Sequence, residues 1–329
     1  MLADVVIGVQ HGDEAKGKVT HYLCKCKDYT HVLRFNGGCN AGHTIYHEGR
    51  KFVTHHIPAG VFYGIKSIIG PGCVVSPPQF FKELQELKEG GIDTDGKVFI
   101  AHNTHVITDL HIMEENYETK IGTTKRGNGP AYRDKHARVG IQAKDVPSLR
   151  PYIVDLYEEF HGDKSVKVLC EGAQGFSLDI DWGDYPFVTS SHVGTAGALL
   201  NAVPHTWIRD VWGVGKVYET YVGSKQFEPK EQVEFFARVR EAGEEYGATT
   251  GRPRQCNFLE LNTLRRAINI NGINKLVLNK VDILRNLETW KLLNNGELYE
   301  FKGEKQFTEF IEEQFSNVEI FFSDSKYKV

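Results

Sequence analysis

A glycine-rich turn near the start of the chain combines residue types that bind phosphate. Gly12 to Lys18 has the spacing of a P-loop, G-x-x-x-x-G-K, and the apolar residues around Gly8 predict a buried strand before it. Two residues depart from the pattern: Val19 stands where an Mg²⁺-binding hydroxyl is expected, and Asp13 places a carboxylate in the loop. Because like charges repel at short range, a carboxylate facing phosphates needs another task. We expect Asp13 to hold Mg²⁺ or to remove a proton.

A second irregular stretch, residues 36–44, brings an amide and an imidazole into a glycine-dense loop. Asn40 and His43 supply these groups. A lone histidine is more often structural, but one beside a phosphate-binding turn is a candidate general acid. We therefore interpret His43 as a candidate acid.

Three further loops carry groups that suit anionic ligands. Residues 122–130 offer backbone donors, hydroxyls and cations that suit a phosphate monoester. Residues 171–175 follow a predicted strand, at the carboxyl end where α/β sheets bind ligands. Residues 247–254 combine two hydroxyls with two guanidiniums, which suits a dicarboxylate. A surface loop is an equally good interpretation of residues 122–130, and a solvated loop is the default interpretation of each of the other two segments taken alone.

The segment Asn279-Lys-Val-Asp282 matches the guanine-reading pattern N-K-x-D at the end of an apolar strand. An aspartate carboxylate can accept two hydrogen bonds from N1–H and the 2-amino group of guanine, and adenine offers no such pair. Four letters match often by chance, so the position at a strand end carries more weight than the letters.

Strand-like and helix-like segments alternate along the chain. This order predicts an α/β fold, with one large domain over residues 1–329 built on a central, mostly parallel sheet with flanking helices. Stripes of apolar residues predict helices from Pro77 to just before Gly90, from Leu149 to Phe160 and from Phe307 to Phe315. The predicted strands are residues 5–9, 67–69, 97–101, 166–170, 212–218, 275–279 and 318–322. The longest irregular stretches are 36–44, 122–130, 171–195 and 222–228.

Composition narrows the class of protein. The net charge of −4 over 329 residues argues against a nucleic-acid-binding surface. The six cysteines form no C-x-x-C pair, which is typical of reduced thiols inside the cell. No apolar run approaches the ~18 residues of a membrane helix. We expect a soluble, cytoplasmic protein with neither membrane nor nucleic acid as a partner.

Taken in order, these segments resemble the adenylosuccinate synthetase family, ligases of purine synthesis, over nearly the whole chain. His11 to Lys18 resembles the family's Q-W-G-D-E-G-K-G-K, and Asn40 to Thr44 its N-A-G-H-T. The chain is shorter than bacterial members and resembles the compact archaeal form and phage relatives that aminate a guanine nucleotide. Further matching segments are residues 122–124, 129–132, 171–175, 185–191, 247–252 and 280–282.

The resemblance implies a fold related to P-loop NTPases and a GTP-dependent ligation of L-aspartate to a 6-oxopurine monophosphate. Asp13 would take the N1 proton and bind Mg²⁺, and the Gly42 carbonyl would join the metal ligands. The O6 anion would attack the γ-phosphate of GTP, with His43 as acid toward the leaving GDP. Aspartate's amine would then displace phosphate from C6.

The resemblance also implies three sets of binding residues. The monophosphate would contact Asn40, Thr124, Gln174, Thr189, Val222 and, from the other subunit of a homodimer, Arg138. The carboxylates of L-aspartate would be held by Thr249, Thr250 and Arg252. GTP would be held by Gly12, Lys16, Gly17, Lys18, Gly42, Thr44, Arg254, Lys280 and Asp282.

Several positions depart from the family pattern. His11 replaces a Trp, Lys125 replaces a small residue, and residues 220–229 read T-Y-V-G-S-K-Q-F-E-P where the family has T-R-V-G-A-G-P-F-P-T-E. The C-terminal guanine-side loop S-T-G-P-D-R is reduced to residues 323–326. Retention of Asp13 favours IMP as substrate, whereas loss of the ribose-side Arg favours dGMP. A GTP-binding regulatory protein without ligase activity is the alternative of another class.

Overall fold

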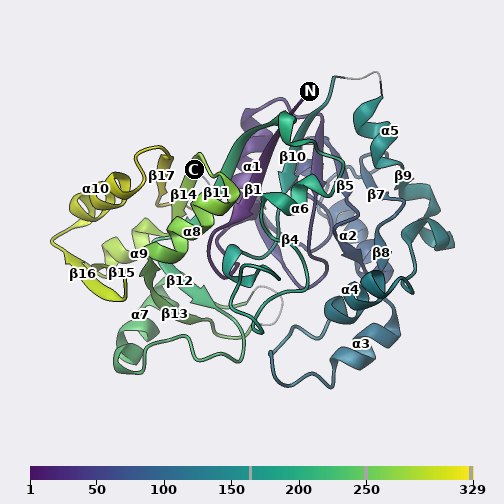
Figure 1. Ribbon diagram of the computed structural model, residues 1–329. Helices are drawn as coiled ribbons and strands as arrows, with labels where there is room; N and C mark the ends of the chain where they lie inside the picture. Colours follow the sequence, from purple (N-terminus) through teal and green to yellow (C-terminus); the bar gives the residue numbers. More distant parts are fainter. Residues whose placement is uncertain (163–164, 248–250, 326–328) are drawn as a thin grey trace.

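A nine-stranded parallel sheet forms the centre of the molecule, in the order β17-β14-β11-β1-β10-β2-β5-β7-β9. The computed structural model describes residues 1–162, 165–247, 251–325 and 329. In Figure 1 the sheet runs from β17 on the left to β9 on the right. Its strands are β1 (Leu2–Gly8), β2 (His31–Arg34), β5 (Lys66–Ile69), β7 (Val98–Ala101), β9 (Ile153–Val154), β10 (Lys167–Glu171), β11 (Ile208–Lys216), β14 (Lys275–Asn279) and β17 (Glu319–Ser323).

Three smaller sheets flank the central one. A four-stranded sheet contains β12 (Tyr218–Tyr221), β13 (Gln255–Glu260), β15 (Trp290–Asn294) and β16 (Glu297–Phe301). An antiparallel hairpin joins β3 (His43–His47) to β4 (Arg50–Thr54), and β6 (Val74–Val75) pairs with β8 (His105–Val106).

Helices cover both faces of the central sheet. The described α-helices are α1 (Lys16–Cys26), α2 (Pro77–Glu89), α3 (Asp109–Glu115), α4 (Asn128–Ala137), α5 (Leu156–His161), α6 (Thr195–Leu199), α7 (Val233–Gly243), α8 (Leu261–Asn271), α9 (Val281–Asn286) and α10 (Glu304–Gln314). No helix among the described residues is long and apolar enough to cross a membrane.

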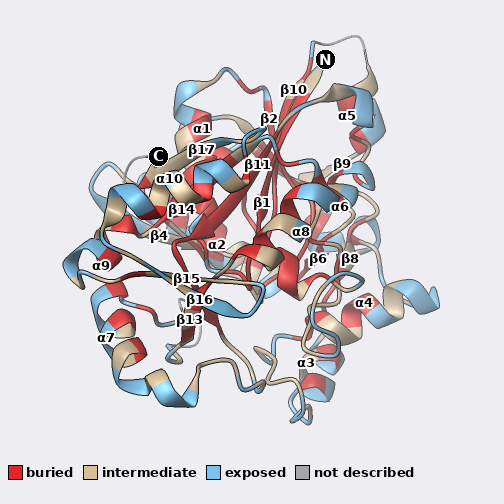
Figure 2. Ribbon diagram, turned by 60° about the vertical axis from the view of Figure 1, so that its left-hand side comes forward, coloured by how far each residue is buried: buried red, intermediate tan, exposed pale blue. Residues whose placement is uncertain are grey.

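Alternation along the strands decides which helix packs on which face. Val6, Leu169 and Val214 belong to one buried cluster with Val19 and Leu23 of α1. Their strand neighbours point to the opposite face, because successive side chains of a strand alternate. There they join residues from α5, α6 and α8 in the largest cluster, which includes Phe160, Ala198, Leu261 and Leu264. Figure 2 shows the central strands buried between these layers.

The strand predictions are confirmed: all seven predicted segments overlap strands of the central sheet. Helices α2 and α10 also match their predictions. The predicted helix from Leu149 to Phe160 is wrong, because its residues divide among the 3₁₀ helix Pro147–Tyr152, strand β9 and helix α5. Pro151 inside this segment removes a backbone donor that a continuous α-helix would need. Two predicted loops are shorter than expected, since β3 begins at His43 and α4 at Asn128.

Candidate functional site

The predicted residues follow strands that end at one edge of the central sheet. Strands β1, β2, β10, β11 and β14 are parallel neighbours, so their carboxyl ends share that edge. The loop after β1 carries Asp13, the segment after β2 carries Asn40, the loop after β10 carries Gln174, and the turn after β14 carries Lys280. The fold therefore brings together loops that are far apart in the sequence.

The loop between β1 and α1 is shaped around Glu14. The Glu14 side chain is completely buried. Its carboxylate accepts hydrogen bonds from the backbone N–H groups of Gln10 (3.2 Å) and Gly12 (2.8 Å) and from Lys16 Nζ (2.5 Å). Glu14 thus fixes the phosphate turn from inside, while the Asp13 side chain next to it is 36% exposed.

Three predicted site residues other than glycine have a left-handed backbone in turns that follow strands of the central sheet. The φ angles of Asp13, Gln174 and Lys280 are 60°, 59° and 70°. This conformation costs residues with a Cβ atom about 1 kcal/mol or more, so it persists where the surrounding structure imposes it. Each residue lies in a turn after a central strand, where the unusual backbone directs the chain along the edge of the sheet.

Asp13 is linked to a buried chain of charges. Arg254 Nε lies 2.9 Å from Asp13 Oδ2, and Arg254 Nη1 lies 2.5 Å from Glu245 Oε2. Lys216 Nζ and the Tyr218 hydroxyl also contact Glu245, at 3.1 Å and 2.6 Å. Although burial opposes the shift, the charges of Lys216 and Arg254 lower the pKa of Glu245 to about 2. Arg254 is therefore held between a permanent buried anion and the candidate base.

His43 is oriented by a buried carboxylate. Its Nδ1 lies 2.6 Å from Glu171 Oε1, which also accepts a hydrogen bond from Arg34 Nη1 at 2.8 Å. Burial lowers the pKa of His43 to about 4, the charge of Arg34 acts in the same direction, and Glu171 opposes both. Hydrogen bonding from His43 and the charge of Arg34 lower the pKa of Glu171 to about 2 despite its burial. In the free protein His43 is thus neutral and donates from Nδ1 to an ionised Glu171.

Gln174 and Asn40 meet beside the phosphate turn. Gln174 Nε2 donates to Asn40 Oδ1 at 3.1 Å, and Asn36 Nδ2 donates to Gln174 Oε1 at 3.2 Å. A Cβ atom on Gly12 would lie 3.5 Å from the Gln174 backbone, so the two loops are in van der Waals contact. These two amides, predicted to bind the monophosphate, are therefore brought together.

Arg252 connects two loops that were predicted to hold different substrates. Its guanidinium lies 3.3 Å from the Thr123 carbonyl and 3.5 Å from that of Gly122. The predicted aspartate-binding Arg252 is thus beside the loop that carries Thr124. The other two predicted aspartate ligands, Thr249 and Thr250, lie outside the described residues.

The predicted guanine end lies at the carboxyl ends of β14 and β17. Lys18 Nζ donates to Asn279 Oδ1 (2.5 Å) and to Ser323 Oγ (2.9 Å). Burial lowers the pKa of Lys18 to about 8, and the nearby Asp282 opposes that shift. Asn279 Nδ2 also donates to the Glu14 backbone carbonyl. The first residue of the N-K-x-D pattern is thus hydrogen-bonded to the phosphate turn. Asp282 lies in the first turn of α9.

Arg138 is not brought together with these residues. It ends helix α4 with a left-handed backbone, φ 66°, and its side chain is exposed. Among the described residues, no hydrogen bond or ion pair joins the Arg138 side chain to the rest of the predicted site. Four other predicted site residues are partly exposed in loops or at strand ends: Thr44, Thr124, Thr189 and Val222.

The donor set around α1 fits a hard divalent cation. The Asp13 carboxylate is partly exposed, and residues 42–43 pack on the first turn of α1, since a Cβ atom on Gly17 would lie 3.1 Å from the His43 Cβ. Carboxylate and carbonyl oxygens are the ligands that Mg²⁺ prefers. Asp13 and the Gly42 carbonyl thus offer donor oxygens of the types that Mg²⁺ prefers.

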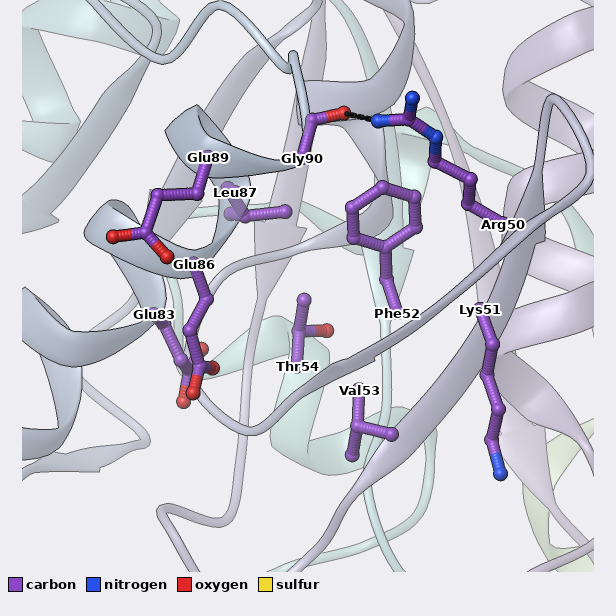
Figure 3. Close-up of a pocket in the computed structure, with 10 residues that line it drawn as sticks. All are labelled: Arg50, Lys51, Phe52, Val53, Thr54, Glu83, Glu86, Leu87, Glu89 and Gly90. Carbon is purple, nitrogen blue, oxygen red and sulfur yellow. Dashed lines mark hydrogen bonds between the residues drawn. The ribbon is translucent and has the colours of Figure 1, made fainter.

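A cavity of about 390 Å³ lies elsewhere, between the β3–β4 hairpin and α2 (Figure 3). Phe52 and Thr54 line it from β4, and Glu83 and Leu87 line it from α2. None of the predicted site residues lines this cavity, so it is not the site described above. It does border the hairpin that begins with His43, because Thr54 is paired with His43 across the two strands.

Comparisons with known proteins find one matching family model and several similar sequences. The family model of adenylosuccinate synthetase matches residues 5–150 and 146–326. The adenylosuccinate synthetase of Caldanaerobacter subterraneus subsp. tengcongensis is 37% identical, over 91% of this chain and 83% of its own. That of Geobacillus kaustophilus is 39% identical, over 89% of this chain and 80% of its own.

Two solved structures share the fold. Fully ligated adenylosuccinate synthetase from Plasmodium falciparum superposes with a TM-score of 0.87 at 28% identity, over 98% of this chain and 97% of the other. Succinoaminodeoxyadenylate synthetase of cyanophage S-2L, bound to dGMP and dATP, has a TM-score of 0.72 at 19% identity, over 95% and 99% of the two chains. At that identity the second likeness concerns the fold alone.

Sequence reasoning missed the buried charges that support the site. Glu14, Arg34, Glu171, Lys216 and Glu245 were not among the predicted site residues. Glu14 and Glu171 stand inside recognised motifs, so their position was a usable signal. Arg34, Lys216 and Glu245 have no local signal, because their roles depend on partners far away in the chain.

Proposed function

Because this chain belongs to the adenylosuccinate synthetase family and is thus a GTP-dependent ligase that forms a C–N bond, we propose that it joins L-aspartate to C6 of IMP. The observation that carries the proposal is the pairing of two adjacent acids: Glu14 is buried and fixes the turn, whereas Asp13 is partly exposed at the start of α1. That exposure leaves the Asp13 carboxylate available to a ligand at the edge of the sheet.

The proposed reaction has two steps. Asp13 takes the proton from N1 of the purine, and the resulting O6 anion attacks the γ-phosphorus of GTP, so that GDP leaves. The amine of L-aspartate then attacks C6, loses a proton and expels phosphate. Phosphorylation is needed because an unactivated 6-oxo group is a poor leaving group, whereas phosphate is a good one.

Mg²⁺, held by Asp13 and the Gly42 carbonyl, would supply charge neutralisation on the transferring phosphoryl group. The dipole of α1 favours anions at its N-terminus, and the Lys16 ammonium lies beside that turn. Both features support binding of the GTP phosphates at residues 12–18.

The proposed role of His43 depends on bound phosphate. With a pKa of about 4, His43 is neutral in the free protein and offers no proton from Nε2. Negative charge from GTP phosphates favours its protonated form, and the Nδ1–H bond to Glu171 stabilises the imidazolium. His43 would then donate to the oxygen that leaves with GDP.

Guanine would be read by Asp282, with Lys280 beside it. Lys280 Nζ donates to the Gly243 carbonyl at 2.6 Å, so its side chain is fixed against the segment that carries Glu245. The carboxylate of Asp282 suits the N1–H and 2-amino donors of guanine. The match between the Asp282 carboxylate and these two donors supports GTP over ATP as the phosphoryl donor.

A homodimer would complete the proposed site. Arg138 is exposed, and the residues after it leave apolar side chains in solvent, with Val139 71% and Ile141 46% exposed. Exposed apolar residues beside a cation suit a protein interface. Through such an interface Arg138 would reach the monophosphate bound by the partner subunit.

The alternative substrate is dGMP. Tyr221 occupies the position of the family's ribose-side Arg and is buried, with its ring 5.5 Å from that of His11. This side of the site thus differs from the family pattern. The similar cyanophage protein was solved with dGMP, but at 19% identity it lends support to the fold alone.

One assay separates the candidate functions. The protein is incubated with GTP, Mg²⁺ and L-aspartate, with IMP or dGMP, and the product is identified by mass. We expect adenylosuccinate from IMP, with one phosphate released per product. Product from dGMP alone would favour the alternative substrate. Phosphate release that requires neither aspartate nor a purine monophosphate would refute the ligase assignment and favour a GTP-binding regulatory protein.

A further inference from the structure

Two residues that depart from the family pattern, His11 and Lys225, lie on either side of Asp184. Together with Glu219 these residues form what we call the Asp184 cluster. Lys225 Nζ forms an ion pair with Asp184 Oδ2, and His11 Nε2 lies 3.6 Å from the same oxygen. Residues from two distant segments therefore converge on the Asp184 carboxylate.

His11 is the buried member of the cluster. The residue is 9% exposed, and its ring packs against Tyr221 and Phe227 at centroid distances of 5.5 Å and 4.8 Å. Its Nδ1 lies 3.1 Å from Glu219 Oε2. Because an ionised carboxylate accepts but does not donate, Nδ1 carries the proton in that bond. The imidazole is thus fixed on one side by Glu219 and faces Asp184 on the other.

Two residues of the cluster, Asp184 and Lys225, lie close in sequence to predicted monophosphate ligands. Asp184 immediately precedes residues 185–191, which contain Thr189, and its carbonyl accepts from Phe187 N at 2.8 Å. Lys225 lies in the segment 222–228, which contains Val222. Gln255 holds that segment in place by donating to the Lys225 carbonyl at 2.8 Å and accepting from Phe227 N at 2.8 Å.

The strength of the cluster depends on burial. The Asp184 side chain is 53% exposed and that of Lys225 27%, and an exposed ion pair alone contributes only about 0–1 kcal/mol. The contact with His11 differs, because His11 Nε2 is buried and makes no hydrogen bond among the described residues, so the Asp184 carboxylate 3.6 Å away acts on it as a charge. Water screens such an electrostatic contact less when one of its partners is buried. The Lys225 ammonium also lies 5.9 Å and 5.8 Å from the Tyr221 and Phe227 ring centres, on the aromatic pair that encloses His11.

We propose that His11 and Lys225 are positioning residues that act through Asp184: they hold residues 185–191 in the conformation that binds the purine monophosphate. This inference rests on the proposed function for its substrate. The Asp184 cluster would then affect the affinity for the monophosphate and not the phosphoryl transfer, because none of the contacts in the cluster involves Asp13, His43 or Lys16. The two residues that depart from the family pattern, His11 and Lys225, then together connect three loops through Asp184.

The test compares Lys225→Met and Asp184→Asn with the control Lys230→Met, which alters an exposed lysine nearby. We expect the two cluster variants to raise KM for the monophosphate about 5- to 20-fold, with kcat and KM for GTP within about twofold of the original protein. Lys225→Arg should restore KM, and the double variant should be no worse than the more affected single variant. The Lys230→Met protein should be unchanged.

A second readout does not require turnover. Backbone amides of residues 185–191 should exchange with deuterium at least about fivefold faster in Asp184→Asn and in His11→Asn, which keeps a donor toward Glu219 but loses the group facing Asp184. Unchanged exchange in these variants would overturn the proposal, as would an unchanged monophosphate KM or an equal rise in KM for GTP. If the unaltered protein makes product from neither IMP nor dGMP, the proposed function fails, and the exchange measurement still decides whether the cluster braces the loop.

Discussion

At the scale of single residues, neighbouring acids in one turn have opposite surroundings. Glu14 is buried and accepts three hydrogen bonds, whereas Asp13 reaches solvent and pairs with Arg254. A carboxylate that is already saturated with donors is a structural anchor. A partly exposed carboxylate with one partner can exchange that partner for a metal ion or a substrate proton.

Asp13→Asn tests the proposed base. Asparagine keeps the shape but accepts no proton, so we expect kcat to fall by about 10²- to 10⁴-fold. GTP binding, measured by calorimetry, should remain detectable because Lys16 and α1 are unchanged. Turnover close to that of the original protein would contradict the role of Asp13 as base.

At the scale of elements, the phosphate turn is positioned by the loop that follows β10. A Cβ atom on Gly175 would lie 2.3 Å from both the Gln10 carbonyl oxygen and Glu14 Oε1. The backbone of Gly175, with φ −151° and ψ 166°, suits any residue. Glycine is thus required here for close approach of two loops and not for backbone freedom.

Gly175→Ala should therefore displace the phosphate turn. We expect the free energy of unfolding to fall by about 1–3 kcal/mol, as for other overpacked sites. Activity should fall at least about tenfold, because the turn carries Asp13. Urea unfolding and the product assay measure the two effects.

The matched control is Gly303→Ala, where a Cβ atom would meet no other group within 4 Å. Its φ of 177° is extended backbone. Equal losses in the two variants would show that close packing at Gly175 is not the cause.

At the scale of the whole molecule, histidines with lowered pKa values connect stability to pH. Burial lowers the pKa values of the buried His56 and the partly buried His21 to about 4 in the folded protein. Their unfolded values are near 6.5, so between pH 4 and 6.5 the unfolded chain binds more protons and stability falls as the pH falls. Each histidine contributes up to about 1.4 kcal/mol per pH unit in that window.

We expect the free energy of unfolding to be lower at pH 5 than at pH 7.5, measured by urea unfolding. His56→Gln should reduce this dependence, since its amide oxygen can accept the hydrogen bond that His56 Nε2 accepts from Ser76 N. Equal stability at the two pH values would contradict the burial of neutral histidines.

The proposed dimer allows a test by subunit mixing. Asp13→Ala and Arg138→Ala proteins should each be nearly inactive alone. If Arg138 serves the partner's site, random reassociation makes half of the dimers mixed, each with one intact site, so activity should return to about a quarter of the original. Sedimentation gives the oligomeric state, and no recovery from a mixture of dimers would contradict the shared site.

The sequence by itself determined seven of the nine central strands and the loops that follow them. Apolar runs and turn residues are local properties of the chain, which is why all seven predicted strands and helix α2 agree with the structure. The short strand β2, with His31 and Arg34, was missed because its buried polar residues break the apolar pattern.

Only the tertiary structure decided which charges are buried together. Arg254 meets Asp13, Glu171 orients His43, and Lys216 neutralises Glu245 across long stretches of sequence. A residue's type sets what it can donate, accept or carry as charge, but its partner and its exposure to water depend on how distant segments pack. The sequence thus supplied candidates for the acid and the base, and the fold buried Glu14 within the phosphate turn and left Asp13 partly exposed at the edge of the sheet.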